Sequence, residues 1–100
     1  MGLDQVDSDF LEKEIDRAVG DVKSTIEMAR NEEYRKFTQI ANESDFTFGW
    51  ALGQIVRGFS YFFLIRHGRN ANESEIKEAV SRVNTKSKEI KDAIFSCLKH

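Results

Sequence analysis

Residues 46–67 read FTFGWALGQIVRGFSYFFLIRH, and this apolar stretch decides the fold. It holds seven of the eleven aromatic residues and three of the six glycines, and it contains no acidic residue. The chain has no proline, so every residue of the stretch can donate a helical hydrogen bond. Gly68 follows it and suits a left-handed helix end. The stretch therefore predicts a central helix that other helices must largely cover.

At 100° per residue, the expected central helix divides into three sectors. The broad apolar sector predicts a core face and consists of Phe48, Leu52, Ile55, Phe59, Phe62 and Phe63. A close-packing strip of small residues would let another backbone approach, and it consists of Gly49, Gly53 and Ser60 with Val56 beside them. The only polar sector consists of Trp50, Gln54, Arg57 and Tyr61.

Amphipathic patterns on both sides predict two further helices. From about Ser8 to Ala41, apolar residues recur at steps of three and four, with Glu33 as the one charged position on the stripe. Gly20 costs about 1 kcal/mol relative to alanine and could split this helix, with Asp21 capping a second piece. Because the stripe keeps its phase across Gly20, we favour one continuous helix. The inward positions are Leu11, Ile15, Ala18, Val22, Ile26, Ala29, Glu33, Phe37 and Ile40.

The third helix is expected from about Glu73 to Leu98, where Asn72 and Glu75 have the spacing of a capping box. Its inward positions follow heptad-like steps and are Ile76, Val80, Val83, Ser87, Ile90, Ile94 and Cys97. Caps of the first two helices are expected from Asp7, Ser8 or Asp9 and from Ser44 or Asp45.

The predicted fold class is therefore all-α, with residues 1–100 forming a single domain built as a three-helix bundle. At 1.5 Å per residue, an unbroken first helix is about 50 Å long and extends beyond its two partners. An overhang with apolar residues needs a second chain to cover it, and the central helix is too apolar for two neighbours. We therefore expect homodimerisation to complete the bundle.

Charge is unevenly distributed along the chain, although the net charge is only −2. Residues 1–45 hold twelve acidic and six basic residues, a net charge of −6. Residues 46–70 hold three arginines and no acidic residue, a net charge of +3, and residues 71–100 have a net charge of +1. This segregation favours self-association or a charged partner over general nucleic-acid binding.

Arg57 is the most informative candidate residue, because a buried unpaired charge would cost several kcal/mol. The simplest interpretation is a structural ion pair with Glu33. The alternatives are a ligand or partner contact shared with Trp50, Gln54 and Tyr61, and simple extension of the Arg57 side chain into solvent.

A second candidate is the basic cluster of Arg66, His67 and Arg69 at the exit of the central helix. It would contact phosphate or nucleic acid, or it would simply complement the negative end of the helix dipole.

Other function classes find little support in the sequence. Residues 46–65 are long enough to span a bilayer, but Gln54 and Arg57 lie near the centre, so we expect no membrane insertion. No metal, cofactor or catalytic residue is predicted, because no Glu-x-x-His pair, phosphate-binding loop or activated nucleophile occurs. Cys97 is the only cysteine and fits an apolar filler. The N-terminus does not resemble a signal peptide, and the expected location is the cytoplasm.

The leading functional prediction is a non-catalytic, homo-oligomeric helical interaction module. The alternative is a small-molecule binding protein with an aromatic pocket around Arg57. A nucleic-acid-binding regulator acting through the basic cluster is a weaker alternative.

Overall fold

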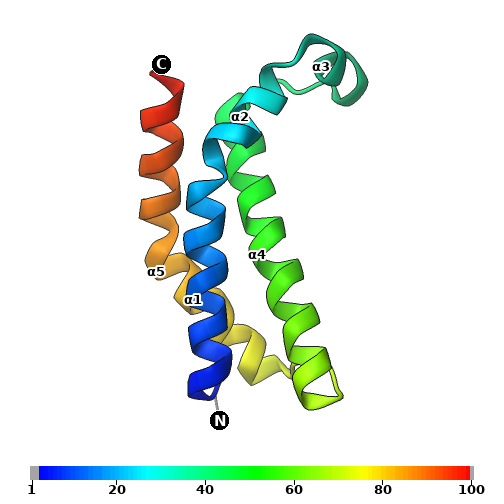
Figure 1. Cartoon of the computed structure of the whole chain (residues 1–100), viewed down its shortest axis with the longest axis vertical. Coiled ribbons are helices and arrows are strands. Elements are labelled where there is room, and N and C mark those ends of the chain that lie inside the picture. The colour runs from blue at the N-terminus through cyan, green and yellow to red at the C-terminus, as the bar shows by residue number, and fades with distance from the viewer. Residues whose placement is uncertain (1–2, 100) are drawn as a thin grey trace.

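The computed structural model describes residues 3–99, and all of its regular elements are α-helices. This confirms the all-α prediction. The five helices are α1 (Gln5–Gly20), α2 (Val22–Arg30), α3 (Glu32–Thr38), α4 (Glu43–His67) and α5 (Glu73–Leu98). Helices α1, α2, α4 and α5 pack together into an elongated body, while α3 projects at one end (Figure 1). The molecule, with α3 included, measures 44 × 25 × 18 Å.

The prediction of one continuous helix from Ser8 to Ala41 is wrong. At Asp21 the chain remains right-handed helical, and its amide still donates to the Arg17 carbonyl, so the break between α1 and α2 is a kink. At Asn31 the backbone is extended, and the Asn31 side chain caps α3 by accepting from the Tyr34 amide. Gln39 then ends α3 in a left-handed conformation.

The turn at Asn31 removes the predicted overhang of a straight first helix. Because α3 points away from the bundle, Phe37 is 87% exposed instead of inward-facing, and Glu33 is also exposed. Helix α3 packs on α2, and Arg35 ties it to the beginning of α4 by donating to Glu43 at 2.9 Å. The salt bridge of Arg30 with the same carboxylate also lowers the pKa of Glu43.

The two later helices agree closely with the sequence prediction. Gly68 ends α4 with a φ of 68°, as expected for a left-handed stop. Asn72 and Glu75 form the predicted capping box of α5. The N-caps of α1 and α4 are Asp4 and Asn42, not the residues predicted a few positions later.

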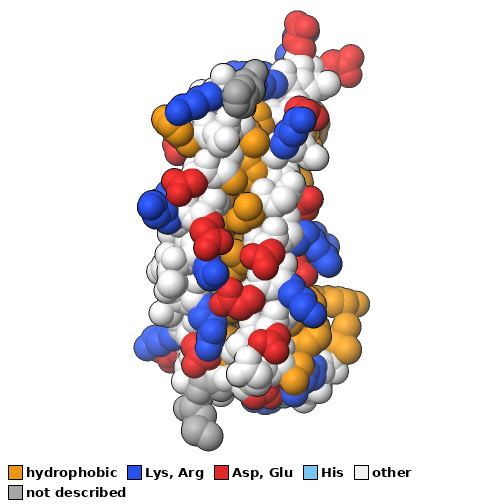
Figure 2. All heavy atoms as spheres, turned by 60° about the vertical axis from the view of Figure 1, so that its left-hand side comes forward, with side chains coloured by type: hydrophobic (Ala, Val, Ile, Leu, Met, Phe, Trp, Pro, Cys, Tyr) orange, Lys and Arg blue, Asp and Glu red, His pale blue; other side chains and the backbone are white. Residues whose placement is uncertain are grey.

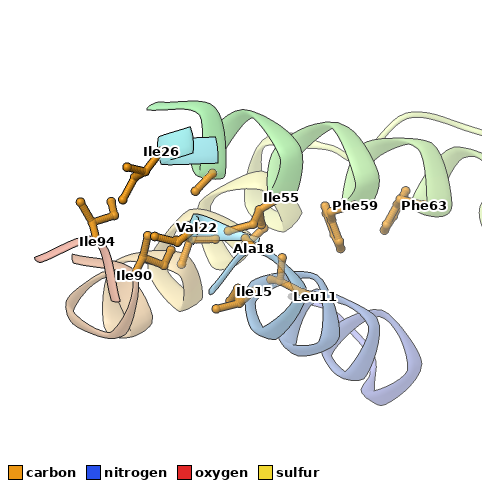
Figure 3. Packing of buried hydrophobic residues seen from close by; sticks show 13 residues of the cluster. Leu11, Ile15, Ala18, Val22, Ile26, Ile55, Phe59, Phe63, Ile90 and Ile94 are labelled. Atoms are coloured by element: carbon orange, nitrogen blue, oxygen red, sulfur yellow. The ribbon is translucent and has the colours of Figure 1, made fainter. Parts of the chain in front are cut away.

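The core runs along the inner faces of four helices and is almost entirely aliphatic and aromatic (Figure 3). The predicted stripe of α1 and α2 is buried from Leu11 to Ala29. Helix α4 contributes Ile55, Phe59 and Phe63, and Phe62 stacks on Phe10 with ring centroids 3.9 Å apart. Helix α5 contributes buried side chains at Ala79, Val83, Ile90 and Ile94.

The first half of α5 is rotated relative to the predicted stripe. Ile76 and Val80 are about half exposed, and Ala79 and Glu75 are buried in their place. Cys97 is a free thiol that packs at the edge of the core, in the position expected for an apolar filler.

The side of the molecule carrying α5 is highly charged, with acidic and basic side chains intermingled on it (Figure 2). Glu12 of α1 lies within salt-bridge distance of both Arg82 and Lys86 of α5. Hydrophobic side chains also reach this side (Figure 2), and Ile76, Val80 and Phe95 of α5 are each about half exposed or more.

Candidate functional site

The outward face of α4 differs from the charged side because it is dominated by glycines and apolar or aromatic residues. Helices α1, α2 and α5 pack against the opposite face of α4. Trp50 and Tyr61 are 39% and 66% exposed, and Val56, Leu64 and Ile65 are also exposed. The outward face consists of Asp45, Phe46, Gly49, Trp50, Gly53, Gln54, Val56, Arg57, Ser60, Tyr61, Leu64 and Ile65, of which Phe46 is partly buried.

The predicted close-packing residues Gly49 and Gly53 both lie on this outward face. A Cβ atom added at either position would meet no heavy atom within 4 Å. Packing within the chain therefore does not require glycine at these two positions. Each glycine inside a helix nevertheless costs about 1 kcal/mol relative to alanine.

Gly58 is the glycine of α4 that does make a close contact within the chain, and the sequence analysis did not single it out. A Cβ atom there would lie 2.7 Å from Oε2 of Glu14. Glu14 is a buried carboxylate of α1, and it lies 3.5 Å from Nη1 of Arg17. The sequence could have indicated this contact through Glu14, an acidic residue next to the apolar stripe of α1. Only the fold shows that Glu14 faces Gly58.

Arg57 is exposed, and the predicted ion pair with Glu33 is wrong. Glu33 lies on the projecting helix α3, and no hydrogen bond or ion pair of Arg57 occurs within residues 3–99. Arg57 therefore has an exposed guanidinium group without a partner in the described part of the chain.

The four residues of the predicted aromatic site do not form one closed pocket. Two open hollows of about 590 and 580 Å³ flank Arg57, and Gln54 lines both of them. Trp50 lies in the first hollow beside Asp45 and Phe46, with the Trp50 and Phe46 ring centroids 5.7 Å apart. Tyr61 lies in the second hollow, which Glu14, Arg17, Ala18 and Gly58 also line.

The predicted basic cluster is brought together, but carboxylates from the N-terminal segment neutralise it. Nη1 of Arg66 donates to Oδ2 of Asp4 and to Oδ1 of Asp7, both at 2.8 Å. Nε2 of His67 lies 2.9 Å from the other oxygen of Asp7, which is buried. These contacts join the beginning of α1 to the end of α4.

Arg69 is also paired, through a two-pronged salt bridge to Glu75 with N–O distances of 2.8 and 3.0 Å. This salt bridge, together with the hydrogen bond from the Asn72 amide, lowers the pKa of Glu75 to about 2. Three carboxylates thus face two guanidinium groups and one imidazole, so the cluster has no excess positive charge.

Asp4, Asp7 and His67 also bring three potential metal-ligand atoms within 4.8 Å of one another. The guanidinium of Arg66 already binds both carboxylates, so a cation has a resident competitor there.

A separate apolar groove of about 370 Å³ lies between α4 and α5. Its floor includes buried core residues, and its rim includes the half-exposed side chains of Val56, Ile76 and Val80. No charged residue lines it. The groove explains why Ile76 and Val80 belong to the apolar stripe of α5 without being covered.

By length and composition alone, α4 could also cross a membrane, and 22% of its most apolar window is buried within the molecule. A single helix with these properties is weak support for insertion, because helices of soluble bundles share them. Comparisons with models of protein families, with curated proteins and with solved structures found no match to this chain.

Proposed function

We propose that this protein is a non-catalytic helical interaction module and that the outward face of α4 binds a second copy of the chain. The proposal rests mainly on Gly49 and Gly53, which lie exposed in the middle of a 25-residue helix without any contact that requires them. A second backbone at close range would give these glycines a role. Homodimerisation would also complete the helical bundle around α4.

The composition of the outward face supports the same proposal. Exposed aromatic and aliphatic side chains that lie side by side are more typical of an interaction surface than of a surface that stays in contact with solvent. Trp50 and Tyr61 belong to the residue types that dominate binding energy at protein interfaces. The side carrying α5 also exposes apolar side chains, at Ile76, Val80 and Phe95, but within residues 3–99 it has no tryptophan or tyrosine and no pair of exposed helical glycines.

The alternatives have weaker support. The ion pairs of Arg66 and Arg69 neutralise the predicted basic cluster, so it is poorly suited to bind nucleic acid. Small-molecule binding would use the free guanidinium of Arg57, but Trp50 and Tyr61 lie in different open hollows. Ligand pockets usually bury most of the ligand surface, and open hollows do not.

Sedimentation velocity of the purified chain across a micromolar concentration series tests the proposal. We expect a reversible dimer, and because Trp50 is the only tryptophan, its emission should shift to the blue as the dimer forms. Gly53→Leu should shift the equilibrium to monomer. Gly20→Leu is the matched control, since a Cβ atom at Gly20 also meets nothing within 4 Å and Gly20 lies on α1.

A wild-type chain that stays monomeric throughout the series would refute the proposal. Equal effects of the two leucine substitutions would also contradict it, because they would point to a general loss of helix packing. Co-sedimentation of the chain with lipid vesicles, without dimer formation, would assign the outward face of α4 to a membrane instead.

A further inference from the structure

Four residues at regular spacing form a single row along the outward face of α4. They are Asp45, Gly49, Gly53 and Arg57, each four positions from the next. Residues four apart lie on one ridge of a helix surface, so the row is a continuous line with an acid at one end and a base at the other. At 1.5 Å per residue, the two charged positions are about 18 Å apart along the helix axis.

Both charged ends of the row lack side-chain partners in the described part of the chain. Asp45 and Arg57 are exposed, and no ion pair of either side chain occurs within residues 3–99. Other charged groups near the ends of α4 are paired. Glu43 forms a salt bridge with Arg30, and Arg66 forms one with Asp4. The same hollow of about 590 Å³ contains the whole row, with Phe46, Trp50 and Gln54 beside it.

We infer that two copies of α4 pack antiparallel along this row, with Asp45 of each copy paired to Arg57 of the other. The inference rests on the proposed function and specifies its geometry. In a twofold-symmetric pair, each contact occurs twice and the surface must be complementary to itself. A row that begins with an acidic residue and ends with a basic residue meets this condition when it packs antiparallel against its own copy.

The register follows from simple counting. If the symmetry axis passes midway between Gly49 and Gly53, each glycine faces the other glycine of the second copy. The same axis places position 45 opposite position 57 at both ends. The two ion pairs and the closest backbone approach therefore form in one arrangement, without adjustment of the row.

Competing arrangements do not combine these contacts. A parallel pair in register would place Asp45 against Asp45 and Arg57 against Arg57, which is repulsive at both ends. An antiparallel pair centred on Gly53 itself would place Arg57 opposite Gly49 and shift both charges out of line. Charge thus selects one orientation and one register from those that the glycines alone would allow.

Reversal of charge at each end of the row tests the inference. Arg57→Glu and Asp45→Arg each turn both ion pairs into like-charge contacts, so each variant should dimerise at least tenfold more weakly than the wild type. An equimolar mixture of the two variants should form a heterodimer with near wild-type affinity, because both contacts are then attractive. The double variant should likewise recover a Kd within about threefold of the wild type. Sedimentation equilibrium measures all four constants, and circular dichroism confirms that each variant remains helical.

Lys23→Glu is the control, because it changes the net charge as much as Arg57→Glu does but lies on α2, away from the row. A wild-type dimer that the single reversals leave unchanged, or that the double variant fails to restore, would overturn the antiparallel register while leaving the proposed function intact. A wild-type chain that does not dimerise at all would instead refute the proposed function.

Discussion

Gly53→Ala should change the stability of the isolated chain and the stability of the dimer in opposite directions. The added Cβ atom meets no heavy atom within 4 Å in the single chain, so it causes no clash there. Replacement of a glycine in a helix interior by alanine stabilises the helix by about 1 kcal/mol. For a domain of this size, such a gain raises the Tm by roughly 4–8 °C.

The same methyl group should weaken self-association, because it occupies the proposed position of closest approach between two copies of α4. We expect the dimer Kd to rise at least tenfold. Urea unfolding at a concentration well below the dimer Kd measures the first effect, and sedimentation equilibrium measures the second. Gly20→Ala serves as the control that relieves a helical glycine without touching the proposed interface.

Two results would refute this reasoning. If Gly53→Ala destabilises the isolated chain, some contact within the chain requires glycine at this position. If the variant is more stable and dimerises as tightly as the wild type, no backbone approaches Gly53 closely.

Four further predictions concern other parts of the molecule. Gly58→Leu should destabilise the isolated chain by about 1–3 kcal/mol in urea unfolding, because its side chain would collide with Glu14, and addition of Glu14→Ala should recover part of the loss. The depressed pKa of Glu75 means that its salt bridge stabilises the fold above pH 4.5 and loses this effect as the pH falls to about 2. The Tm of Glu75→Gln should therefore fall less steeply than that of the wild type in this range, and parallel curves would contradict the assignment. Ile55→Ala should cost about 2–5 kcal/mol of unfolding free energy, since Ile55 is fully buried. Phe37→Ser should change the unfolding free energy by less than about 0.5 kcal/mol, and a larger loss would mean that Phe37 is covered.

Local signals in the sequence were enough to predict the last two helices. The end of α4 depends on Gly68, and the beginning of α5 depends on hydrogen bonds between Asn72 and Glu75. These interactions span at most a few residues, so the sequence contains them directly. The core stripe of α1 and α2 was also predictable, because one face of a helix must be apolar to be buried.

The break at Asn31 was not predicted because the apolar stripe continues across it to Phe37 and Ile40. Periodicity indicates that a face is apolar, but it does not indicate whether anything covers that face. The same reason explains the error at Ile76 and Val80, which continue the stripe of α5 yet border an open groove. Both errors lie where an apolar position has no neighbouring helix in the single chain.

The candidate site was predictable in its composition but not in its electrostatics. The sequence placed Trp50, Gln54, Arg57 and Tyr61 in one sector, and the structure leaves them all on the exposed side of α4. The pairing of Arg66 with Asp4 joins residues 62 positions apart, so only tertiary structure reveals it. Likewise, only the tertiary structure shows that Arg57 has no acidic partner in the described part of the chain.

The three glycines of α4 differ in what the single chain can explain. Gly58 is required by the chain itself, because Glu14 occupies the space that a side chain would fill. Gly49 and Gly53 make the helix less stable by about 2 kcal/mol together and relieve no contact in return. A cost of this size is a substantial fraction of the 5–15 kcal/mol by which small domains are stable. In the proposed dimer, close contact between two copies of α4 would offset this cost. The charges of Asp45 and Arg57, which have no partner within residues 3–99, would then favour the antiparallel orientation of the two helices.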